Sequence, residues 1–488
     1  MLTLVNTNRM TPAIGPIGLD YVAASARRAG IEVEVLDLGL VEEPDKTMQD
    51  YFDGHNPELV GLSFRNSDDC FWPSADWFVP GLKNTVEKIR RLTDAPIVVG
   101  GVGFSIFARS IYEYVDIDFG MCGDGETAIV ALTNQLRGAR KFAEVPGLIW
   151  RQDERIIENP PVFLLSDKES GPYSISLGSA RDFIDNRAYF KKGGQCGIET
   201  KRGCNRHCIY CADSLAKGTK LRLRNPAEIA DEVQSLLRQG IDVLHICDAE
   251  FNVPRSHAYA VCEEFIERSL GEKVRWYAYM SPTPFDADLA GAMARAGCIG
   301  IDFTGDSASE SMLKIYRQQH SRRDLAEAVK LCRDNNIAVM IDLLLGGPGE
   351  TPKTVRETIE FLKKIDPDCA GATLGMRIYP RTAMAKMVAA ELLPDNDVTI
   401  RRKYDGPVDL LKPTFYISEA LGENPARLVK EMIAGDSRFF EPAEQIDMQA
   451  SSEDDTSDYN YNDNEPLLKA IEKGARGAYW HILHQLRI

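Results

Sequence analysis

Short apolar segments alternate with amphipathic segments along the first 145 residues of the chain. The apolar segments predict β-strands at Leu2–Asn6, Ile31–Leu38, Leu59–Phe64 and Pro96–Gly101. Apolar spacings of three and four residues predict helices at Leu19–Ala29 and Leu82–Leu92. Strands that alternate with helices indicate a parallel sheet, so residues 1–145 are expected to form a doubly wound, Rossmann-like α/β domain.

A second series of the same kind spans residues 196–390. Its predicted strands are Ile198–Arg202, Val243–Cys247, Val274–Met280, Ile299–Phe303, Ala338–Leu345 and Ala372–Tyr379. Predicted helices lie between them, for example at Pro226–Arg238 and Thr351–Lys364. Six strand–helix units predict a partial (β/α)6 TIM-like barrel, in which ligands bind at the C-terminal ends of the strands.

Two regions show a weaker pattern. Residues 146–195 are richer in Pro, Gly and Ser and are interpreted as a connector between the two domains. Residues 391–488 are expected to form a small, mostly helical C-terminal region. Within this region the acidic, polar residues 451–465 predict a flexible linker, and Pro466–Ile488 predicts one amphipathic helix.

The composition narrows the possible functions. The 488 residues carry a formal charge of −16, which disfavours binding to nucleic acid or to anionic membranes. The longest apolar runs fall short of the roughly 18 residues that a membrane span needs. The first residues lack the pattern of a signal peptide, so we expect a cytoplasmic protein. Eleven cysteines, mostly scattered, suit buried thiols and a ligand set in a reducing compartment.

Three of these cysteines lie in one short loop, Cys204, Cys208 and Cys211, with C-x-x-x-C-x-x-C spacing. Zinc would require a fourth ligand; His207 is the only nearby candidate, and its position beside Cys208 is poor for tetrahedral closure. A redox C-x-x-C pair formed by Cys208 and Cys211 is a further alternative. An iron–sulfur cluster fits best, because three thiolates on a four-iron cluster leave one iron open to a small chelating molecule.

The loop resembles the signature of radical S-adenosylmethionine (SAM) enzymes, including the aromatic residue Tyr210 before the last cysteine. Four later segments, in the same order as in that family, resemble its SAM-binding motifs: Asp248-Ala249-Glu250, Thr304-Gly305-Asp306-Ser307, Leu345-Gly346-Gly347-Pro348-Gly349-Glu350 and Gly375-Met376-Arg377-Ile378-Tyr379-Pro380. The resemblance implies a 4Fe-4S cluster on the three cysteines. It also implies SAM contacts from Tyr210, Asp248, Glu250, Asp306, Gly346, Gly347 and Arg377.

The N-terminal domain resembles the cobalamin-binding domain of cobalamin-dependent radical SAM enzymes. The matching segments are Gly15-Pro16-Ile17-Gly18-Leu19, Val60-Gly61-Leu62-Ser63, Val99-Gly100-Gly101 and Gly123-Asp124-Gly125-Glu126. The resemblance implies that Ser63, Gly100 and Gly101 contact cobalamin. The D-x-H-x-x-G motif of many cobalamin domains is missing, and His55 is expected to be a surface residue. The alternative is a domain of the same fold that binds no cofactor.

The resemblance as a whole implies a C-methyltransferase that acts on an unactivated carbon of a small molecule. In that family reaction a 5′-deoxyadenosyl radical removes a substrate hydrogen atom, and methylcobalamin supplies the methyl group. It also implies an external one-electron reductant such as flavodoxin or ferredoxin. Two alternatives stay open: non-methylating radical chemistry such as cyclisation or ring contraction, and a redox protein that carries a cluster but acts on no substrate.

Overall fold

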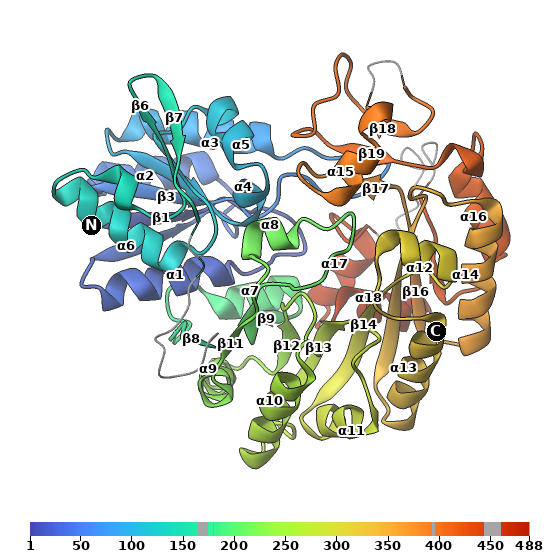
Figure 1. The fold of residues 1–488 in the computed structure, drawn as a ribbon. Helices are drawn as coiled ribbons and strands as arrows, with labels where there is room; N and C mark the ends of the chain where they lie inside the picture. Colours follow the sequence, from blue (N-terminus) through green and yellow to red (C-terminus); the bar gives the residue numbers. More distant parts are fainter. Residues whose placement is uncertain (162, 164–173, 179, 393–395, 444–459, 488) are drawn as a thin grey trace.

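The computed structural model describes residues 1–161, 163, 174–178, 180–392, 396–443 and 460–487. Two α/β units lie side by side in it (Figure 1), with the N-terminal unit drawn in blue and the barrel in green to orange. No helix among these residues is long and apolar enough to cross a lipid bilayer. Both predicted α/β units are therefore present, in the predicted order along the chain.

The N-terminal sheet has seven strands in the order β2-β1-β3-β4-β5-β6-β7. Its bounds are β1 Leu2–Asn6, β2 Val33–Asp37, β3 Leu59–Ser63, β4 Ile97–Gly100, β5 Phe119–Met121, β6 Leu148–Gln152 and β7 Arg155–Glu158. The first five strands are parallel, as expected of a doubly wound sheet. The last two form an antiparallel hairpin on β5, so this sheet extends into the region interpreted as a connector.

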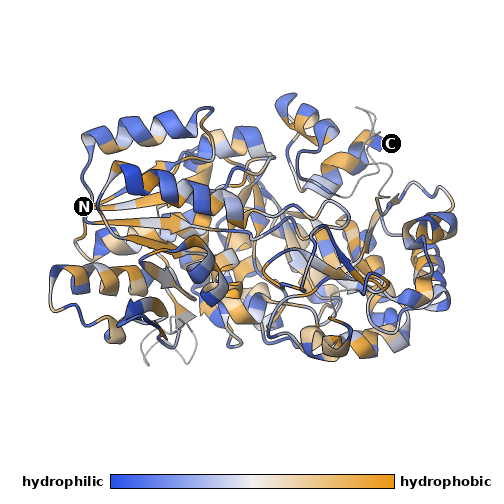
Figure 2. Ribbon diagram, turned by 90° about the horizontal axis from the view of Figure 1, so that it is seen from above, coloured by the Kyte–Doolittle hydropathy of each residue, from blue (hydrophilic) through white to orange (hydrophobic). Residues whose placement is uncertain are grey.

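Helices cover both faces of this sheet. Helices α1 (Ile17–Arg28) and α6 (Gly125–Arg137) pack on one face, and α2 (Pro44–Gly54), α3 (Val79–Leu92) and α5 (Ala108–Val115) pack on the other. Figure 2 shows the apolar strands between helices whose outer faces are hydrophilic. The buried strands and the one-sided helices thus account for the doubly wound architecture.

The barrel sheet also has seven strands, all parallel, in the order β20-β16-β15-β14-β13-β12-β9. They are β9 Cys196–Ile198, β12 Val243–Ile246, β13 Arg275–Met280, β14 Cys298–Asp306, β15 Ala338–Leu345, β16 Cys369–Leu374 and β20 Phe439–Phe440. The outer helices are α9 Pro226–Arg238, α10 Arg255–Glu267, α11 Ala287–Arg295, α12 Glu310–Tyr316, α13 Arg322–Asp334, α14 Pro352–Ile365 and α16 Pro425–Ile433. The partial barrel is confirmed, and the C-terminal region adds strand β20 to it.

Smaller elements complete the chain. They are α4 Val102–Ile106, β8 Ser174–Ile175, α7 Asn186–Gly193, β10 Lys201–Arg202, α8 Asp213–Lys217, β11 Arg222–Arg224, β17 Met376–Arg377, α15 Ala383–Met387, β18 Ile400–Arg402 and β19 Thr414–Tyr416. Strands β17, β19 and β18 form a separate antiparallel sheet. The predicted sixth barrel strand is therefore divided between β16 and β17.

The C-terminal end differs from the predicted single helix. It forms two helices, α17 (Glu465–Glu472) and α18 (Tyr479–Arg487), separated by a turn. Gly477 in that turn has φ +152°, and a Cβ there would lie 2.6 Å from the Tyr277 hydroxyl. The prediction of one helix was wrong because this glycine turn packs against a barrel strand. Residues 451–459 of the predicted acidic linker lie outside the described residues.

Helices α17 and α18, red in Figure 1, pack within the curve of the barrel sheet. Leu467, Trp480 and Leu483 form one apolar cluster with Tyr277 and Met340, which lie on the inner face of β13 and β15. The inner faces of β13 and β15 are thus covered near their N-terminal ends. The barrel interior consequently has an apolar floor that is built by the end of the chain.

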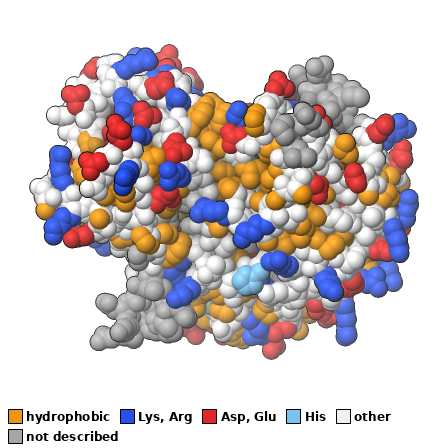
Figure 3. Space-filling model, turned by 45° about the horizontal axis from the view of Figure 1, so that its top comes forward, with side chains coloured by type: hydrophobic (Ala, Val, Ile, Leu, Met, Phe, Trp, Pro, Cys, Tyr) orange, Lys and Arg blue, Asp and Glu red, His pale blue; other side chains and the backbone are white. Residues whose placement is uncertain are grey.

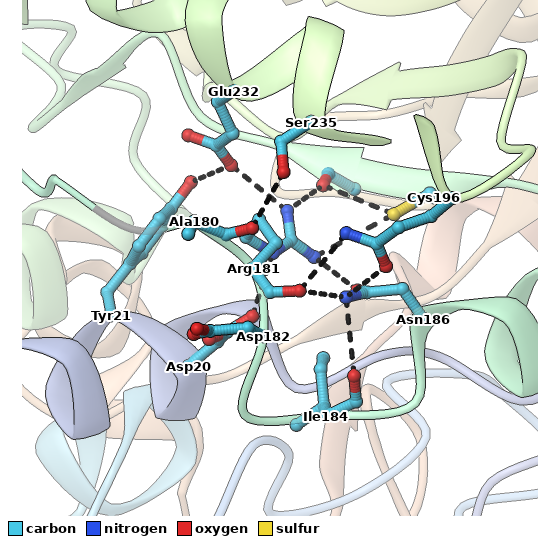
Figure 4. Close-up of polar contacts among 12 residues, drawn as sticks. Asp20, Tyr21, Ala180, Arg181, Asp182, Ile184, Asn186, Cys196, Glu232 and Ser235 are labelled. Atoms are coloured by element: carbon cyan, nitrogen blue, oxygen red, sulfur yellow. Dashed lines mark hydrogen bonds and ion pairs between the residues drawn. The ribbon is translucent and has the colours of Figure 1, made fainter. Parts of the chain in front are cut away.

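Buried ion pairs join the two units. Figure 4 shows Arg181, which is 1% exposed, between Asp20 of α1 and Glu232 of α9. Its Nε donates to Asp20 Oδ2 at 3.0 Å and its Nη1 donates to Glu232 Oε1 at 3.1 Å. Arg224 Nη2 donates to the second Glu232 oxygen at 2.7 Å, and the Tyr21 hydroxyl donates to the first at 2.8 Å. This network links both units through a segment that belongs to neither sheet.

A second and a third set of ion pairs lie nearer the strand ends. Arg202 contacts Asp124 at 3.3 Å and Glu126 at 2.8 Å. These two acidic residues belong to the Gly123–Glu126 segment that resembles the cobalamin family. Arg377 of β17 contacts Asp68 of the N-terminal unit at 2.9 Å, with both side chains 1% exposed. Because buried ion pairs tolerate little misalignment, these contacts fix how the two units are oriented.

The Arg181 network predicts a large loss of stability when its cation is removed. Substitution R181M leaves the Asp20 and Glu232 carboxylates buried without their shared partner. Such a loss typically costs about 3–5 kcal/mol. We expect the thermal unfolding midpoint, followed by circular dichroism, to fall well below that of the wild-type chain.

The matched control is R27M on α1, the helix that also carries Asp20. Arg27 pairs with Asp182 at 3.0 Å, but the two side chains are 53% and 47% exposed. Exposed pairs contribute about 0–1 kcal/mol, so this midpoint should barely change. Equal midpoints for the two variants would contradict a joining role for the Arg181 network.

Candidate functional site

The three-cysteine loop connects β10 to α8 at the C-terminal end of the first barrel strands. Ile209, inside the loop, is fully buried and anchors it. The Ile209 amide donates to the Tyr316 carbonyl at 3.2 Å, and the Met384 amide donates to the Ile209 carbonyl at 2.9 Å. The loop is therefore held from two sides, and the residues that flank Ile209 are turned toward the barrel mouth.

Cys204, Cys208 and Cys211 all line one cavity of about 290 Å³. None of the eleven cysteines is in a disulfide. Burial raises the pKa of the Cys208 thiol to about 12 and also raises the pKa of Cys204 and Cys211. These thiols would stay protonated in neutral solution, so a bound metal would have to displace their protons.

The donor set suits an iron–sulfur cluster better than a single metal ion. Among the described residues, no three His, Cys, Asp or Glu side chains converge closely enough to hold one ion. Three soft thiolates spread around a cavity can instead bind separate irons of one cluster. His207 is exposed. The zinc alternative therefore finds no support in the geometry.

A hydrogen-bonded group lies beside Cys208. The Tyr210 hydroxyl donates to Asp306 Oδ2 at 2.7 Å, and Gln318 Nε2 donates to the same oxygen. Gln318 also lies 3.4 Å from the Cys208 sulfur. Burial raises the pKa of Asp306 to about 6, against the effect of both hydrogen bonds. The structure thus brings Tyr210 and Asp306 together at the cavity, with Gln318 as a partner that no sequence pattern indicated.

The two acidic residues of the Asp248–Glu250 segment have different surroundings. Asp248 is 3% exposed and accepts hydrogen bonds from the Thr200 hydroxyl and from Lys201 Nζ. Glu250 lines the cavity, where its Oε1 accepts from the Thr304 hydroxyl at 3.0 Å and its Oε2 has no hydrogen-bond partner. Burial raises the pKa of Glu250 to about 7. Glu250 is therefore the residue of this segment that is available to a ligand.

Of the remaining predicted SAM-side residues, Gly346 and Gly347 follow β15, and Arg377 lies on β17. Gly346 has φ +89°, which favours glycine, and a Cβ on Gly347 would lie 2.4 Å from the Tyr316 hydroxyl. All five N–H donors of Arg377 face protein acceptors: Asp68 and the carbonyls of Ile378, Leu410 and Thr414. Arg377 therefore serves the contact between the units, and its guanidinium is not free for a carboxylate ligand.

The C-terminal edge of the N-terminal sheet faces the cysteine loop. Ser63 and Gly100 are paired neighbours at the ends of β3 and β4. Gly101 has φ +104°, and a Cβ there would lie 2.5 Å from the Phe64 carbonyl oxygen. Helix α4, which begins at Val102, packs against α8 directly after the cysteine loop. The three residues predicted to contact cobalamin thus form an edge of bare backbone and one small side chain.

This edge fits a broad, flat, largely apolar ligand. Val102 remains 38% exposed beside it. Figure 3 shows hydrophobic side chains gathered between the two units, where the surface is hollowed. His55 lies at the end of α2, beyond the opposite edge of the sheet, and stacks on Tyr51. It is the only histidine before the cysteine loop, so a ligand at this edge would receive no axial histidine from the N-terminal unit.

Comparisons with known proteins agree with both halves of the chain. Residues 198–362 match the model of the radical SAM superfamily, and residues 5–133 match that of the B12 binding domain. The tryptophan 2-C-methyltransferase of Streptomyces laurentii is 28% identical over 98% of this chain and 95% of its own length. An anaerobic magnesium-protoporphyrin IX monomethyl ester cyclase of Cereibacter sphaeroides is 25% identical over 65% of this chain and 51% of its own.

The solved structures of the radical SAM methyltransferase TsrM from Kitasatospora setae are also similar. One, with tryptophan substrate and the SAM analogue aza-SAM bound, gives a TM-score of 0.89 and 29% identity over 99% of this chain and 97% of its own. Another, with cobalamin and a [4Fe-4S] cluster bound, gives a TM-score of 0.87 at 28% identity. The chain thus combines a radical SAM domain with a B12-binding domain.

The cavity predicts that iron is lost when one thiol is removed. In C208A two thiols remain on a loop that Ile209 still anchors, so the chain should fold but hold little iron. We expect iron content and visible cluster absorption after anaerobic reconstitution to fall to a small fraction of the wild-type values. The control C332A removes a buried thiol of the barrel core and should keep its iron. Full iron content in C208A would contradict the assignment.

Proposed function

We propose that this protein, a cobalamin-dependent radical SAM enzyme by its two domains, is a methyltransferase that methylates a carbon atom of a small molecule. The observation that carries the proposal is the apposition of two sites. The cysteine cavity and the bare edge of the N-terminal sheet face each other through α8 and α4. Relatives named as methyltransferases align along nearly the whole chain, whereas the cyclase aligns over a smaller part.

The residues divide into three groups by what they would hold. The cysteines would bind a 4Fe-4S cluster. Glu250 would hold the ammonium group of SAM, and Tyr210, Asp306 and Gly346-Gly347 would shape the rest of its site. Ser63, Gly100 and Gly101 would contact cobalamin. When bound, these groups supply an electron for cleavage of a sulfonium bond and a transferable methyl group.

The chain itself contributes position and the exclusion of water. Hydrogen bonds from Thr304 to Glu250 and from Tyr210 to Asp306 position the two carboxyl groups. The floor formed by α17 and α18 closes the barrel from below. A substrate in the barrel can therefore approach the cofactors only from one side, which favours a single reacting geometry.

The proposal extends to the substrate, the reductant and the cellular setting of the reaction. Tryptophan, the substrate of two of the relatives, is the first compound to test. An external one-electron reductant such as flavodoxin or ferredoxin would reduce the cluster. A reducing, cytoplasmic setting suits eleven cysteines without a disulfide. The net charge of −16 supports a small molecule over a nucleic acid as substrate.

A labelled-methyl assay tests the proposal. The anaerobically reconstituted chain, with reductant, cobalamin and SAM carrying a labelled methyl group, should transfer the label to a carbon of tryptophan or of a related small molecule. C208A should transfer none, and C332A should match the wild-type chain. Mass spectrometry of the product locates the label on carbon.

Two other outcomes would contradict the proposal, and each would favour a different function. Release of 5′-deoxyadenosine without label in any product would favour non-methylating chemistry such as ring formation. Cluster reduction with neither product would favour a redox protein that has no substrate.

A further inference from the structure

The inner face of the barrel has a polar layer directly above its apolar floor. On β13 and β15, Tyr277 and Met340 contact the floor helices, and the next inward positions are Tyr279 and Asp342. Asp302 on β14 lies beside Tyr279 in the strand register. Tyr279 is 39% exposed although it points into the barrel, so solvent reaches this layer. The layer lies between the floor and the cysteine cavity.

Asp302 and Asp342 form a carboxyl pair without a cationic partner. They occupy the same face of neighbouring strands, two positions apart in register, and their side chains hydrogen-bond to each other. Asp302 is 3% exposed. The Oδ1 atom of each residue is buried and has no hydrogen-bond partner. Among the described residues, neither carboxyl group forms an ion pair with a lysine or an arginine.

Burial makes the carboxyl pair unfavourable in free energy when no ligand is bound to it. Burial raises the pKa of Asp302 well above its usual value and that of Asp342 to about 7. The nearby carboxyl groups of Glu250 and Asp306 add negative charge. Two carboxyl groups in one buried site cannot both be ionised, so the pair retains a proton at neutral pH. A ligand cation would replace that proton and satisfy the free oxygens.

The shape of the layer favours an organic cation over a metal ion. Two carboxyl groups are too few for a metal, and the described residues contain no set of three ligands. The walls are aromatic: the His245 and Tyr279 rings lie 4.8 Å apart, and the Tyr461 and Tyr479 rings 5.7 Å apart. Burial and the nearby carboxyl pair raise the pKa of the Tyr461 and Tyr279 hydroxyl groups. Aromatic faces and carboxylates together suit an aromatic amine.

We propose that Asp302 and Asp342 bind the protonated amino group of a small aromatic amine or amino acid, which is the substrate. This inference rests on the proposed function, because it places that substrate below the cofactors. Thr304, which donates a hydrogen bond to Glu250 at the cavity, follows Asp302 by two residues on β14, a distance of about 6.6 Å along the strand. A molecule held by its amine at the pair extends its carbon framework over that distance toward the cysteine cavity.

Ligand binding to the full chain tests the inference without any turnover. Tryptamine and 3-propylindole have nearly the same shape, but only tryptamine carries an ammonium group. By isothermal titration calorimetry the wild-type chain should bind tryptamine about tenfold more tightly or better. Titrations in buffers of different ionisation enthalpy should show release of about one proton per tryptamine, because the ammonium displaces the proton of the pair.

Substitutions of the two aspartates test whether the preference for tryptamine depends on them. D302N and D342N should each lose that preference while their affinity for 3-propylindole stays unchanged, which also shows that they are folded. The control D334N alters an exposed carboxylate that pairs with Lys330 on α13 and should behave as wild type. Equal affinity of the wild-type chain for both probes, or no binding of tryptamine, would overturn the inference, as would tryptamine binding unchanged in D302N and D342N.

The inference and the proposed function can fail separately. Amine binding that depends on the carboxyl pair, without transfer of the labelled methyl group, would support the amine subsite and contradict the methyltransferase proposal. Methyl transfer to a molecule without an amine would support the methyltransferase proposal and contradict the amine subsite.

Discussion

The site depends on the fixed apposition of two strand ends, one from each α/β unit. Three sets of buried ion pairs hold this arrangement: Arg181 with Asp20 and Glu232, Arg202 with Asp124 and Glu126, and Arg377 with Asp68. Buried charges are expensive to desolvate, so they contribute little net stability but strongly penalise misalignment. An active site built between two units needs that property, because a displacement of about 1 Å can cost a large part of the rate.

The barrel interior is organised in layers along its strands. An apolar floor comes from α17 and α18, a polar layer contains Asp302 and Asp342, and the cysteine cavity lies above. Each step corresponds to two residues on a strand, since alternate side chains share a face. The outer faces of the same strands carry the main apolar core. The alternation that stabilises the barrel thus also arranges its functional groups by depth.

Much of this could be predicted from the sequence. The apolar segments located both sheets, and the cysteine spacing located the cluster loop, because those signals are local. Glu250 and Asp248 could not be told apart locally, since only the fold gives Asp248 the Thr200 and Lys201 donors. The ion pair of Arg377 could not be found locally either, because its partner Asp68 lies 309 residues away along the chain.

Other features lacked a recognised signal. Gln318 gains its role from a loop after α12 that no motif marks. Asp302 and Asp342 did carry a signal: Asp342 is the one acidic residue of β15, and Asp302 lies between Ile301 and Phe303 within β14. A charge at such a position must find a partner or a ligand. The glycine turn before α18 also required the fold, because its partner Tyr277 lies on a distant strand.

The central claim is that one chain brings a 4Fe-4S cluster and cobalamin into a shared space. Electron paramagnetic resonance of the anaerobic chain, with the cluster reduced and the corrinoid as cob(II)alamin, tests this most directly. Two paramagnets held close together broaden or split each other's signals, and the account predicts that interaction in the wild-type chain. Two unperturbed signals, or the absence of either centre after reconstitution, would contradict it.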